Sequence, residues 1–272
     1  MIDLHLHTTA SDGALAPAAL VARAAAAGIT VMAVTDHDTT NGLDEARASA
    51  SSRGIRLVNG IEITAVEGDR DVHVLGYFFD PANAALRAFL ATQRDDRIRR
   101  VREMADRLGA LGAPIDPQPI VDEGLATGRS VGRPHVAAAL LAAGHVTNRD
   151  EAFQRFLENG RPAFVPRRGA SPDDVVGIIT RAGGVASLAH PGLAGMDAII
   201  PRLTRAGLHA LEARHTDHDA ATEARYRGLA AELGVAVSAG SDFHDDTGRR
   251  RCGLGEMTLT VPELAALEAR RG

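Results

Sequence analysis

Short apolar runs alternate with alanine-rich stretches of helical periodicity, and this alternation limits the fold more than any other feature of the chain. Strands are predicted, in chain order, at residues 2–6, 29–35, 55–63, 72–79, 185–189, 208–212 and 235–239, with a last strand and helix within 257–270. Helices are predicted at residues 17–27, 41–53, 172–182, 196–206 and 219–233. Strands that alternate with helices form parallel sheets, so we expect an α/β fold, a distorted (β/α)7-type barrel with a helical insertion domain.

The alternation stops between residues 81 and 164, where the pattern is helical throughout. A long arginine-rich helix is predicted first, followed by three shorter helices, at residues 84–111, 120–125, 135–143 and 149–157. We therefore expect residues 1–80 and 165–272 to form the barrel. Residues 81–164 are expected to form a helical insertion domain.

The basic residues are all arginine, because the chain contains no lysine. This absence excludes several kinds of active site: a lysine Schiff base, a pyridoxal phosphate anchor, a Walker lysine and a carbamylated lysine that bridges two metals. The net charge of -5 argues against a broad basic surface for long nucleic acid.

Cysteine and hydropathy narrow the class of protein further. Cys252 is the only cysteine, which excludes an intrachain disulfide and a zinc site built from several cysteines. No apolar run approaches the length of about 20 residues that a membrane span requires. The N-terminus has no basic region followed by an apolar stretch, so we expect a cytoplasmic protein.

Two histidines follow each other at a spacing of two in the first predicted strand. Side chains alternate across a strand, so His5 and His7 point the same way, about 6.6 Å apart along the strand. A pair of imidazoles on one face can chelate a metal ion, although buried histidines that bond to the backbone are also common. Asp12 lies on a tight turn just past the end of this strand.

Further polar residues lie at the ends of other predicted strands. A glutamate, Glu62, lies inside an apolar stretch, where an unpaired carboxylate would be costly without a metal ion or an arginine. Strand ends converge at the mouth of a β/α barrel, so these side chains are expected to meet. The predicted metal ligands are His5, His7, Asp12, His37, Glu62, His73, His190, Asp242 and His244.

This number of nitrogen and oxygen donors matches two or three divalent ions rather than one. Because no thiolate is present, manganese, zinc or iron is favoured over copper(I) or an iron–sulfur cluster. The remaining histidines lie in predicted helices or loops, and we expect most of them to be solvated: His135, His145, His209, His215 and His218.

The donor-bearing segments resemble the motifs of the PHP (polymerase and histidinol phosphatase) family. They are, in chain order, DLHLHTTASDG, TDHDTTNG, NGIEIT, HVLGYF, AHP and SDFH. The resemblance covers nearly the whole chain, because the helical part, with Gly132-Arg133-Pro134-His135, is similar to the insertion of one branch. That branch contains 3',5'-nucleoside bisphosphate phosphatases and 5'-to-3' exoribonucleases.

The resemblance implies a specific distribution of ligands over three ions. One ion would be held by His5, His7, Glu62 and Asp242. A second would share Glu62 and be completed by His73 and His190, and a third would be held by Asp12, His37 and His244. Many relatives carry histidine in place of Asp12. The expected catalytic residues are Asp12, His37, Glu62, Asp242 and His244, acting with a hydroxide that bridges two ions.

Arginines of the insertion are the candidates for binding a substrate phosphate. Arg133 and His135 lie at a predicted helix start, where backbone N–H groups also favour phosphate, although capping and solvation are alternatives. Arg97 and Arg100 share one face of the long helix. Near the ligands, Asp36 is expected to orient a histidine, and Asp38 to cap the next helix.

We expect a metal-dependent phosphoesterase that hydrolyses a phosphomonoester of a nucleotide, with the 3'-phosphate of 3',5'-nucleoside bisphosphates as the leading substrate. Because aromatic residues are scarce, with no tryptophan and two tyrosines, a short oligonucleotide fits better than a long strand. The alternatives are a 5'-to-3' exoribonuclease on short RNA, a histidinol phosphatase, a non-catalytic PHP scaffold and an amidohydrolase-like enzyme. We expect no membrane association.

Overall fold

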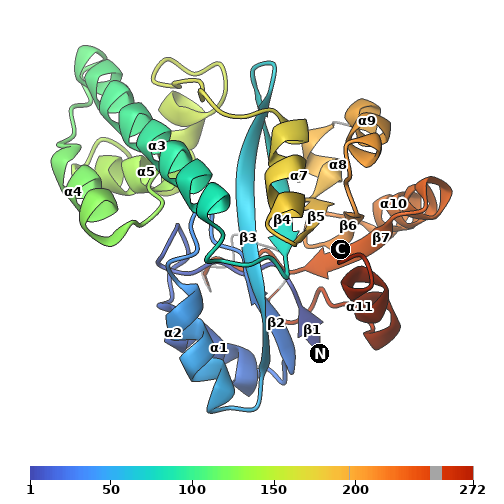
Figure 1. The fold of residues 1–272 in the computed structure, drawn as a ribbon. Coiled ribbons are helices and arrows are strands. Elements are labelled where there is room, and N and C mark those ends of the chain that lie inside the picture. Colours follow the sequence, from blue (N-terminus) through green and yellow to red (C-terminus); the bar gives the residue numbers. More distant parts are fainter. Residues whose placement is uncertain (196, 246–252, 272) are drawn as a thin grey trace.

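The computed structural model describes residues 1–195, 197–245 and 253–271, and its sheet has seven strands (Figure 1). The strands are β1 (Ile2–Asp3), β2 (Val31–Val34), β3 (Arg56–Glu67), β4 (Arg70–Tyr77), β5 (Val185–Leu188), β6 (Ala210–His215) and β7 (Ala236–Gly240). Each strand pairs with the next one along the chain. Cys252 lies outside the described residues.

The sheet curves until its first and last strands meet. The Leu4 N–H donates to the Ala239 carbonyl over 3.2 Å, and Leu6 forms a parallel bridge with Phe243 just beyond β7. These contacts make the sheet a nearly closed barrel, and the predicted α/β barrel class is confirmed.

The direction of β4 corrects the prediction of a parallel sheet. β4 is antiparallel to both β3 and β5, whereas the other neighbouring pairs are parallel. Glu67 pairs with Arg70, so only Gly68 and Asp69 connect the two strands. A loop of two residues joins antiparallel strands only, and Gly68 adopts the positive φ of 64° that such tight turns require. The strand pattern was detected in the sequence, but this turn was not.

Helices cover the outside of the barrel. They are α1 (Pro17–Ala26), α2 (Leu43–Ser51), α7 (Pro172–Arg181), α9 (Ile200–Arg205), α10 (Ala220–Leu233) and α11 (Val261–Glu268). The helix predicted at 196–206 is shorter in the structure, because a 3-10 helix (Asp197–Ile199) precedes α9, which has a proline in its first turn. Met196 lies outside the described residues, and the short helix α8 (Pro191–Ala194) lies before it.

The strand predicted within 257–270 is wrong for the residues that the structure describes there. The Leu259 N–H bonds to the Ile2 carbonyl at 3.0 Å, but the chain then enters α11 directly. Thr260 and Glu263 form a reciprocal cap at the start of this helix, which ends the extended segment after one bond to the sheet.

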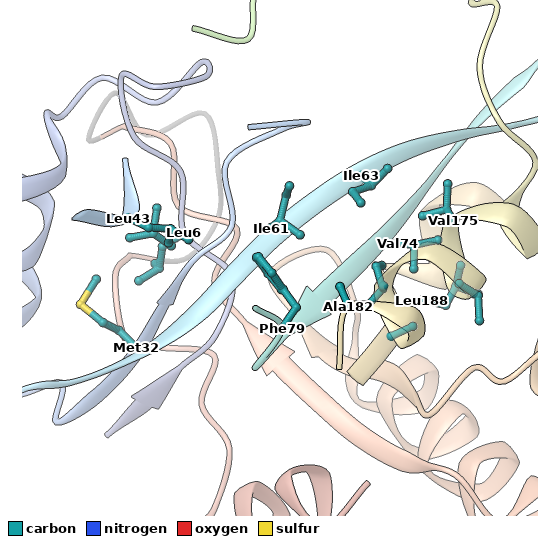
Figure 2. Close-up of a cluster of buried hydrophobic side chains, with 14 of the residues drawn as sticks. Leu6, Met32, Leu43, Ile61, Ile63, Val74, Phe79, Val175, Ala182 and Leu188 are labelled. Atoms are coloured by element: carbon teal, nitrogen blue, oxygen red, sulfur yellow. The ribbon is translucent and has the colours of Figure 1, made fainter. Parts of the chain in front are cut away.

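The hydrophobic core lies between the strands and the helices that cover them (Figure 2). On β3, Ile61 and Ile63 point into this core, where Val175 of α7 also lies. Burying each such large apolar side chain contributes about 1.5–3 kcal/mol. Because side chains alternate along a strand, Glu62 between them points to the opposite face, toward the barrel interior. The core packing thus fixes the orientation of this carboxylate.

The helical segment between β4 and α7 has a hydrophobic cluster of its own. It contains α3 (Ala84–Ala110), α4 (Gln118–Thr127), α5 (Arg133–Ala142), α6 (Arg149–Ala152) and a π-helix (Phe153–Leu157). Residues such as Val101, Leu140 and Leu157 pack together there, apart from the barrel core. On this basis we propose that residues 81–164 form an insertion domain in a barrel of 1–80 and 165–272. Within the described part of the chain, no helix combines the length and apolarity needed to span a bilayer.

Candidate metal centre

Close packing of β7 against the segment that follows β1 brings the first donors together. At Gly240 of β7, a Cβ would lie 2.2 Å from the Cβ of His5 and 2.5 Å from its backbone nitrogen, so only glycine permits this contact. Asp3 fixes the same junction by accepting the Ser241 N–H at 3.0 Å and the Ser241 hydroxyl at 2.7 Å. As a result, Nε2 of His5 lies 3.5 Å from Oδ1 of Asp242.

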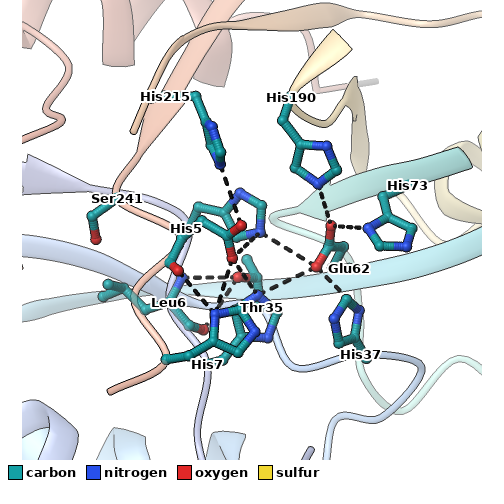
Figure 3. Close-up of polar contacts among 12 residues, drawn as sticks. His5, Leu6, His7, Thr35, His37, Glu62, His73, His190, His215 and Ser241 are labelled. Atoms are coloured by element: carbon teal, nitrogen blue, oxygen red, sulfur yellow. Dashed lines mark hydrogen bonds and ion pairs between the residues drawn. The ribbon is translucent and has the colours of Figure 1, made fainter. Parts of the chain in front are cut away.

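Glu62 lies at the centre of the cluster of imidazoles, with a side chain that is 1% exposed (Figure 3). Its Oε2 lies 3.3 Å from Nε2 of both His5 and His7, and 3.1 Å from Nδ1 of His37. A buried carboxylate without positive partners would be strongly unfavourable. The surrounding nitrogens therefore either carry protons or bind a cation that the carboxylate also binds.

The other oxygen of Glu62 faces a second group of donors. Oε1 lies 2.8 Å from Nδ1 of His73 and 3.1 Å from Nε2 of His190. His190 follows β5 at its carboxyl end, where the predicted barrel mouth lies, but His73 lies near the start of β4. Because β4 is antiparallel, its start faces the same mouth as the ends of its neighbours. The corrected strand direction thus explains how His73 reaches the centre.

Four groups of donors have ligand atoms within 4.8 Å of one another, and three of them consist only of predicted metal ligands. These three are His5, His7 and Asp242; His37, Glu62 and His73; and His7, Asp12, His37 and His244. The fourth contains His5, Glu212 and His215. The structure thus brings together all of the predicted metal ligands, including the donors before β2 and those after β7. In the third group, Nε2 of His244 lies 3.4 Å from Oδ1 of Asp12, and Nε2 of His37 lies 3.8 Å from Oδ2.

Asp36 holds the loop that carries Asp12. Its carboxylate accepts the Thr8 N–H at 2.8 Å, the Thr8 hydroxyl at 2.6 Å and the Ser11 hydroxyl at 2.6 Å. The expectation that Asp36 bonds to a histidine is therefore corrected: it orients the segment between His7 and Asp12 instead. These bonds satisfy a fully buried carboxylate and fix the position of the neighbouring ligands.

Burial and opposite charge compete for the protonation states of the centre. Burial raises the pKa of Glu62, but the imidazoles of His37, His73 and His5 outweigh it and hold that pKa well below its usual range. Burial lowers the pKa of His7, but the nearby carboxylates of Asp242 and Glu62 raise it to about 10. For His37 burial dominates and lowers the pKa to about 3. The carboxylates are therefore charged at neutral pH, and some of the imidazoles hold protons that a metal ion would displace.

Several buried ring nitrogens have no hydrogen-bond partner among the described residues. They include Nε2 of His5, both nitrogens of His7, Nδ1 of His37 and Nδ1 of His73. Buried polar atoms without partners are rare unless an ion or a functional group occupies the site. With carboxylates between them, these nitrogens fit zinc, manganese or iron, which bind imidazole and carboxylate together.

Two residues of β6 belong to the centre although sequence reasoning missed them. Glu212 is fully buried, and its Oε1 lies 2.8 Å from Nδ1 of His5. His215 is also fully buried, with Nε2 at 3.3 Å from Oδ2 of Asp242, so the expectation that it is solvated is wrong. The signal for Glu212 was available: like Glu62, it is an acidic residue inside a predicted apolar strand.

Asp38 does not cap a helix, because α2 begins only at Leu43. It is fully buried, and its Oδ2 accepts from Nε of Arg97 at 2.6 Å and from Arg167 at 3.3 Å. The Thr64 N–H donates to the other oxygen at 2.9 Å. Burial raises the pKa of Asp38, but the charges of Arg97 and Arg167, together with the hydrogen bonds from Thr64 and Arg97, outweigh burial and lower the pKa. Arg97, a candidate for binding substrate, is thus already paired with a carboxylate of the barrel.

Three arginines gather around Asp71: Arg100, Arg133 and Arg167. Together with Asp71, Arg97 and Asp38, they form what we call the arginine cluster. Arg133 donates to Oδ2 of Asp71 at 3.2 Å, and Nε of Arg167 lies 3.7 Å from Oδ1. Arg100 is 2% exposed and donates to the Val165 carbonyl, but its NH2 has no partner among the described residues. Burial, followed by the charge of Arg167, lowers the pKa of Arg100 to about 9.

A cavity of about 560 Å³ opens above the metal centre. Its lining combines donors of the centre with residues of the insertion and of α8: Asp12, His37, Glu62, His73, Pro134, Arg149, Asp150, Phe153, His190, Leu193, Asp217, Asp242, His244 and Asp245. His135 does not line it, but its buried Nε2 has no partner among the described residues, and burial lowers its pKa to about 4. Volumes of this size are typical of sites for small molecules.

Strained backbone also concentrates at the centre. Among the described residues other than glycine, positive φ angles occur at Asp38, Phe78, His190 and Asp242. Two of these are donors of the centre, and Asp38 directly follows a third, His37. Such conformations cost about 1–3 kcal/mol each and persist where the surroundings enforce them, often at functional sites.

Comparison with known proteins identifies relatives over most of the chain. The PHP domain model matches residues 3–130. The 3',5'-nucleoside bisphosphate phosphatase of Chromobacterium violaceum is 38% identical over 89% of this chain and 87% of its own length. The 5'-3' exoribonuclease Rnm of Salmonella typhimurium is 33% identical over 89% and 84%. The crystal structure of an inferred metal-dependent phosphoesterase from Bifidobacterium adolescentis has a TM-score of 0.88 and 33% identity, covering 99% of this chain and 96% of that one.

Proposed function

The chain belongs to the PHP family and is a metal-dependent phosphoesterase, and from this premise we propose that it hydrolyses the 3'-phosphate of 3',5'-nucleoside bisphosphates. One observation carries the proposal: the metal centre lies directly beside a cluster of buried and half-buried arginines. Asp71 forms an ion pair with Arg133, and His73 faces Glu62. Asp71 and His73 are two residues apart on β4 and therefore lie on the same face of the strand. A substrate with two phosphates would use both regions.

The donor groups fit a resident set of divalent ions. We propose that His5, His7 and Asp242 share one ion with Glu62, that His73 and His190 share another with Glu62, and that Asp12, His37 and His244 hold a third. When bound, such ions lower the pKa of water and neutralise charge on phosphoryl oxygens. The protein keeps the carboxylates charged, orients the imidazoles through buried hydrogen bonds and encloses the reacting phosphate in the cavity.

The arginine cluster supplies positive charge beyond what its carboxylates neutralise. Four guanidinium groups, of Arg97, Arg100, Arg133 and Arg167, face two carboxylates, of Asp38 and Asp71. Burial of unbalanced positive charge is unfavourable unless an anion binds. We propose that Arg133 and Arg100 bind the phosphate that is not cleaved, whereas Arg97 holds Asp38 and His135 supports the start of α5 through its bond with the Gly132 N–H.

The upper wall of the cavity fits the rest of a nucleotide. Phe153 begins the π-helix, an element that occurs often at functional sites, and Leu193 of α8 is 56% exposed. Both line the same cavity as the metal donors, together with Pro134. A nucleobase placed between these apolar side chains would bury its faces while its phosphates remain at the two charged regions.

Incubation of the purified protein with adenosine 3',5'-bisphosphate tests the proposal. With manganese, we expect release of one phosphate and accumulation of adenosine 5'-phosphate. An aryl phosphate serves as a control for the metal chemistry alone. Turnover of the aryl phosphate without turnover of the bisphosphate would reject the proposed substrate while retaining the phosphoesterase activity.

A second candidate is stepwise 5'-to-3' hydrolysis of short RNA. The relative from Salmonella typhimurium named as an exoribonuclease supports it, because it matches the chain over both the barrel and the insertion. The two candidates share the ions and the arginines and differ in the length of the substrate. A 5'-phosphorylated oligoribonucleotide, compared with the bisphosphate at equal concentration, separates them by the ratio of their kcat/KM values.

A further inference from the structure

Glu212 connects two parts of the metal centre although it lies in a strand that supplies none of the proposed ligands. Its side chain is fully buried in β6. Oε1 lies 2.8 Å from Nδ1 of His5, and Oε2 accepts the backbone N–H of His190 at 2.8 Å. His5 and His190 belong to different donor groups. One carboxylate thus uses both of its oxygens to hold residues of two different ion sites.

The bond to His5 determines which ring nitrogen can bind a metal. A charged carboxylate accepts hydrogen bonds and donates none, so Nδ1 of His5 must carry the proton. Nε2 is then the nitrogen left to bind a metal, and it faces the centre, where Glu62 lies at 3.3 Å and Asp242 at 3.5 Å. A histidine that binds a metal through one nitrogen commonly donates from the other to a carboxylate, which fixes the ring and makes it a stronger ligand.

The bond to His190 acts on the backbone. His190 has φ 28° and ψ 55°, a conformation that residues with a side chain rarely adopt. The carboxylate of Glu212 accepts its N–H at this strained position and so keeps the peptide in place. With the backbone fixed in this way, Nε2 of His190 lies 3.1 Å from Oε1 of Glu62.

A neighbouring residue of β6 acts in the same sense on Asp242. Nδ1 of His215 accepts the Asp217 N–H at 3.1 Å, so Nε2 carries the proton and faces Oδ2 of Asp242 at 3.3 Å. Oδ1 of Asp242 is left toward His7, at 3.1 Å from Nε2. β6 therefore orients donors from three other segments of the chain.

We propose that Glu212 is a positioning residue that sets the relative position of two metal sites by fixing the ring of His5 and the backbone of His190. It is not a ligand itself. Donor atoms of His5, Glu212 and His215 lie close enough to suggest a separate ion. However, Nδ1 of His5 contacts Glu212 directly at 2.8 Å, and both nitrogens of His215 have partners.

The substitution Glu212→Gln tests this role, because the amide keeps the shape of the side chain but can accept through only one atom. Its NH2 group must face either the protonated Nδ1 of His5 or the N–H of His190. We expect affinity for manganese, measured by calorimetry without substrate, to fall about 10–100-fold for at least two ions. With saturating manganese, kcat on an aryl phosphate should fall while KM changes less than about twofold, because positioning acts on the reacting step.

The matched control is Glu67→Gln. Glu67 is the last residue of β3 and forms an ion pair with Arg202 at 2.7 Å. This variant should bind manganese as the wild type does. If Glu212→Gln folds and binds manganese with wild-type affinity, the proposal is wrong. Loss of one ion alone, with the others bound normally, would also overturn it, because Glu212 would then act on a single site.

A measurement on the wild-type protein keeps the test decisive even if Glu212→Gln does not fold. Ring ¹⁵N–¹H correlation spectra of the protein loaded with zinc should show the proton of His5 on Nδ1. A proton on Nε2 would reject the proposed role. The inference depends on the proposed function only for the kinetic readout, since metal binding and the position of this proton are measured without substrate. An inactive wild-type protein would therefore reject the function and leave this inference intact.

Discussion

The metal centre and the arginine cluster lie side by side and have opposite needs for charge. In the centre, buried carboxylates such as Glu62 and Asp242 require cations, and the protein alone satisfies them by protonating imidazoles. In the cluster, buried guanidinium groups outnumber the carboxylates of Asp38 and Asp71. The comparison teaches that each region is incomplete alone in a complementary way. We propose that divalent ions complete the first and that an anionic part of the substrate completes the second.

Removal of the ions should have the largest effect, because the proposed reaction depends on them and the buried carboxylates of the centre lose their cations. A chelator is expected to abolish phosphate release and to lower the Tm, since each ion bound at 100 times its Kd contributes about 2.7 kcal/mol to stability. We expect a decrease in Tm of at least about 5 °C, measured by calorimetry, and recovery on adding manganese. An unchanged activity after exhaustive dialysis against the chelator would contradict the assignment of the centre.

Asp242→Asn removes one charge from the centre and should lower kcat/KM by about 10³-fold, equivalent to about 4 kcal/mol in the barrier. The reason is that Asp242 faces both His5 and His7, and an amide cannot balance a divalent ion there. Asp44→Asn, on the exposed surface of α2, is the matched control. Metal content should decrease in the first variant only; retention of all ions with full activity would rule out the role of Asp242.

Asp38→Asn removes one charge from the arginine cluster and should lower the free energy of unfolding rather than the metal content. Arg97 and Arg167 would remain buried with a neutral partner, so the free energy of unfolding is expected to decrease by about 3 kcal/mol. Denaturant titration measures this decrease. Wild-type stability in this variant would mean that the arginines are not dependent on Asp38.

The ion pairs of Asp38 with Arg97 and Arg167 also make the stability of the protein depend on pH, and the sign of this dependence can be predicted. Because the pKa of Asp38 is lower in the folded protein than in the unfolded chain, its contribution is fully present above the unfolded pKa. It is lost as the pH falls through the folded pKa, where the carboxylate takes up a proton. Between neutral pH and pH about 3, the stability difference between wild type and Asp38→Asn should therefore become smaller. A difference that grows on acidification would contradict the pairing.

Arg133→Ala probes the contact of the cluster with substrate and should have the smallest effect. Loss of a hydrogen bond between charged groups costs about 1.5–3 kcal/mol, so KM for the bisphosphate should rise about 10–100-fold. KM for an aryl phosphate should change little, because that substrate has no second phosphate. Arg47→Ala, on exposed α2, controls for loss of surface charge. Equal effects on both substrates would show that Arg133 does not bind the second phosphate.

The sequence allowed most of the barrel and the proximity of all the predicted metal donors to be predicted, since these depend on local patterns. Strand alternation and the position of His5, His37 and Asp242 at strand ends were sufficient for that. The direction of β4 could not be predicted in the same way, because it depends on a turn of two residues after an unusually long strand. Partners that come from distant segments were also missed, as with Asp38, whose charge is balanced by an arginine 59 residues away.

The residues of the centre differ in how far apart in the sequence their partners lie. Glu62 and His73 come from adjacent strands of one hairpin, so they approach each other after closure of a short loop. His5 and Glu212, in contrast, are 207 residues apart and meet only when both ends of the chain have been brought together. Closing a longer loop costs more entropy, and long-range contacts form more slowly. We therefore expect a nascent chain to complete its metal centre late, once β6 and β7 have been added to a hairpin whose donors are already in place.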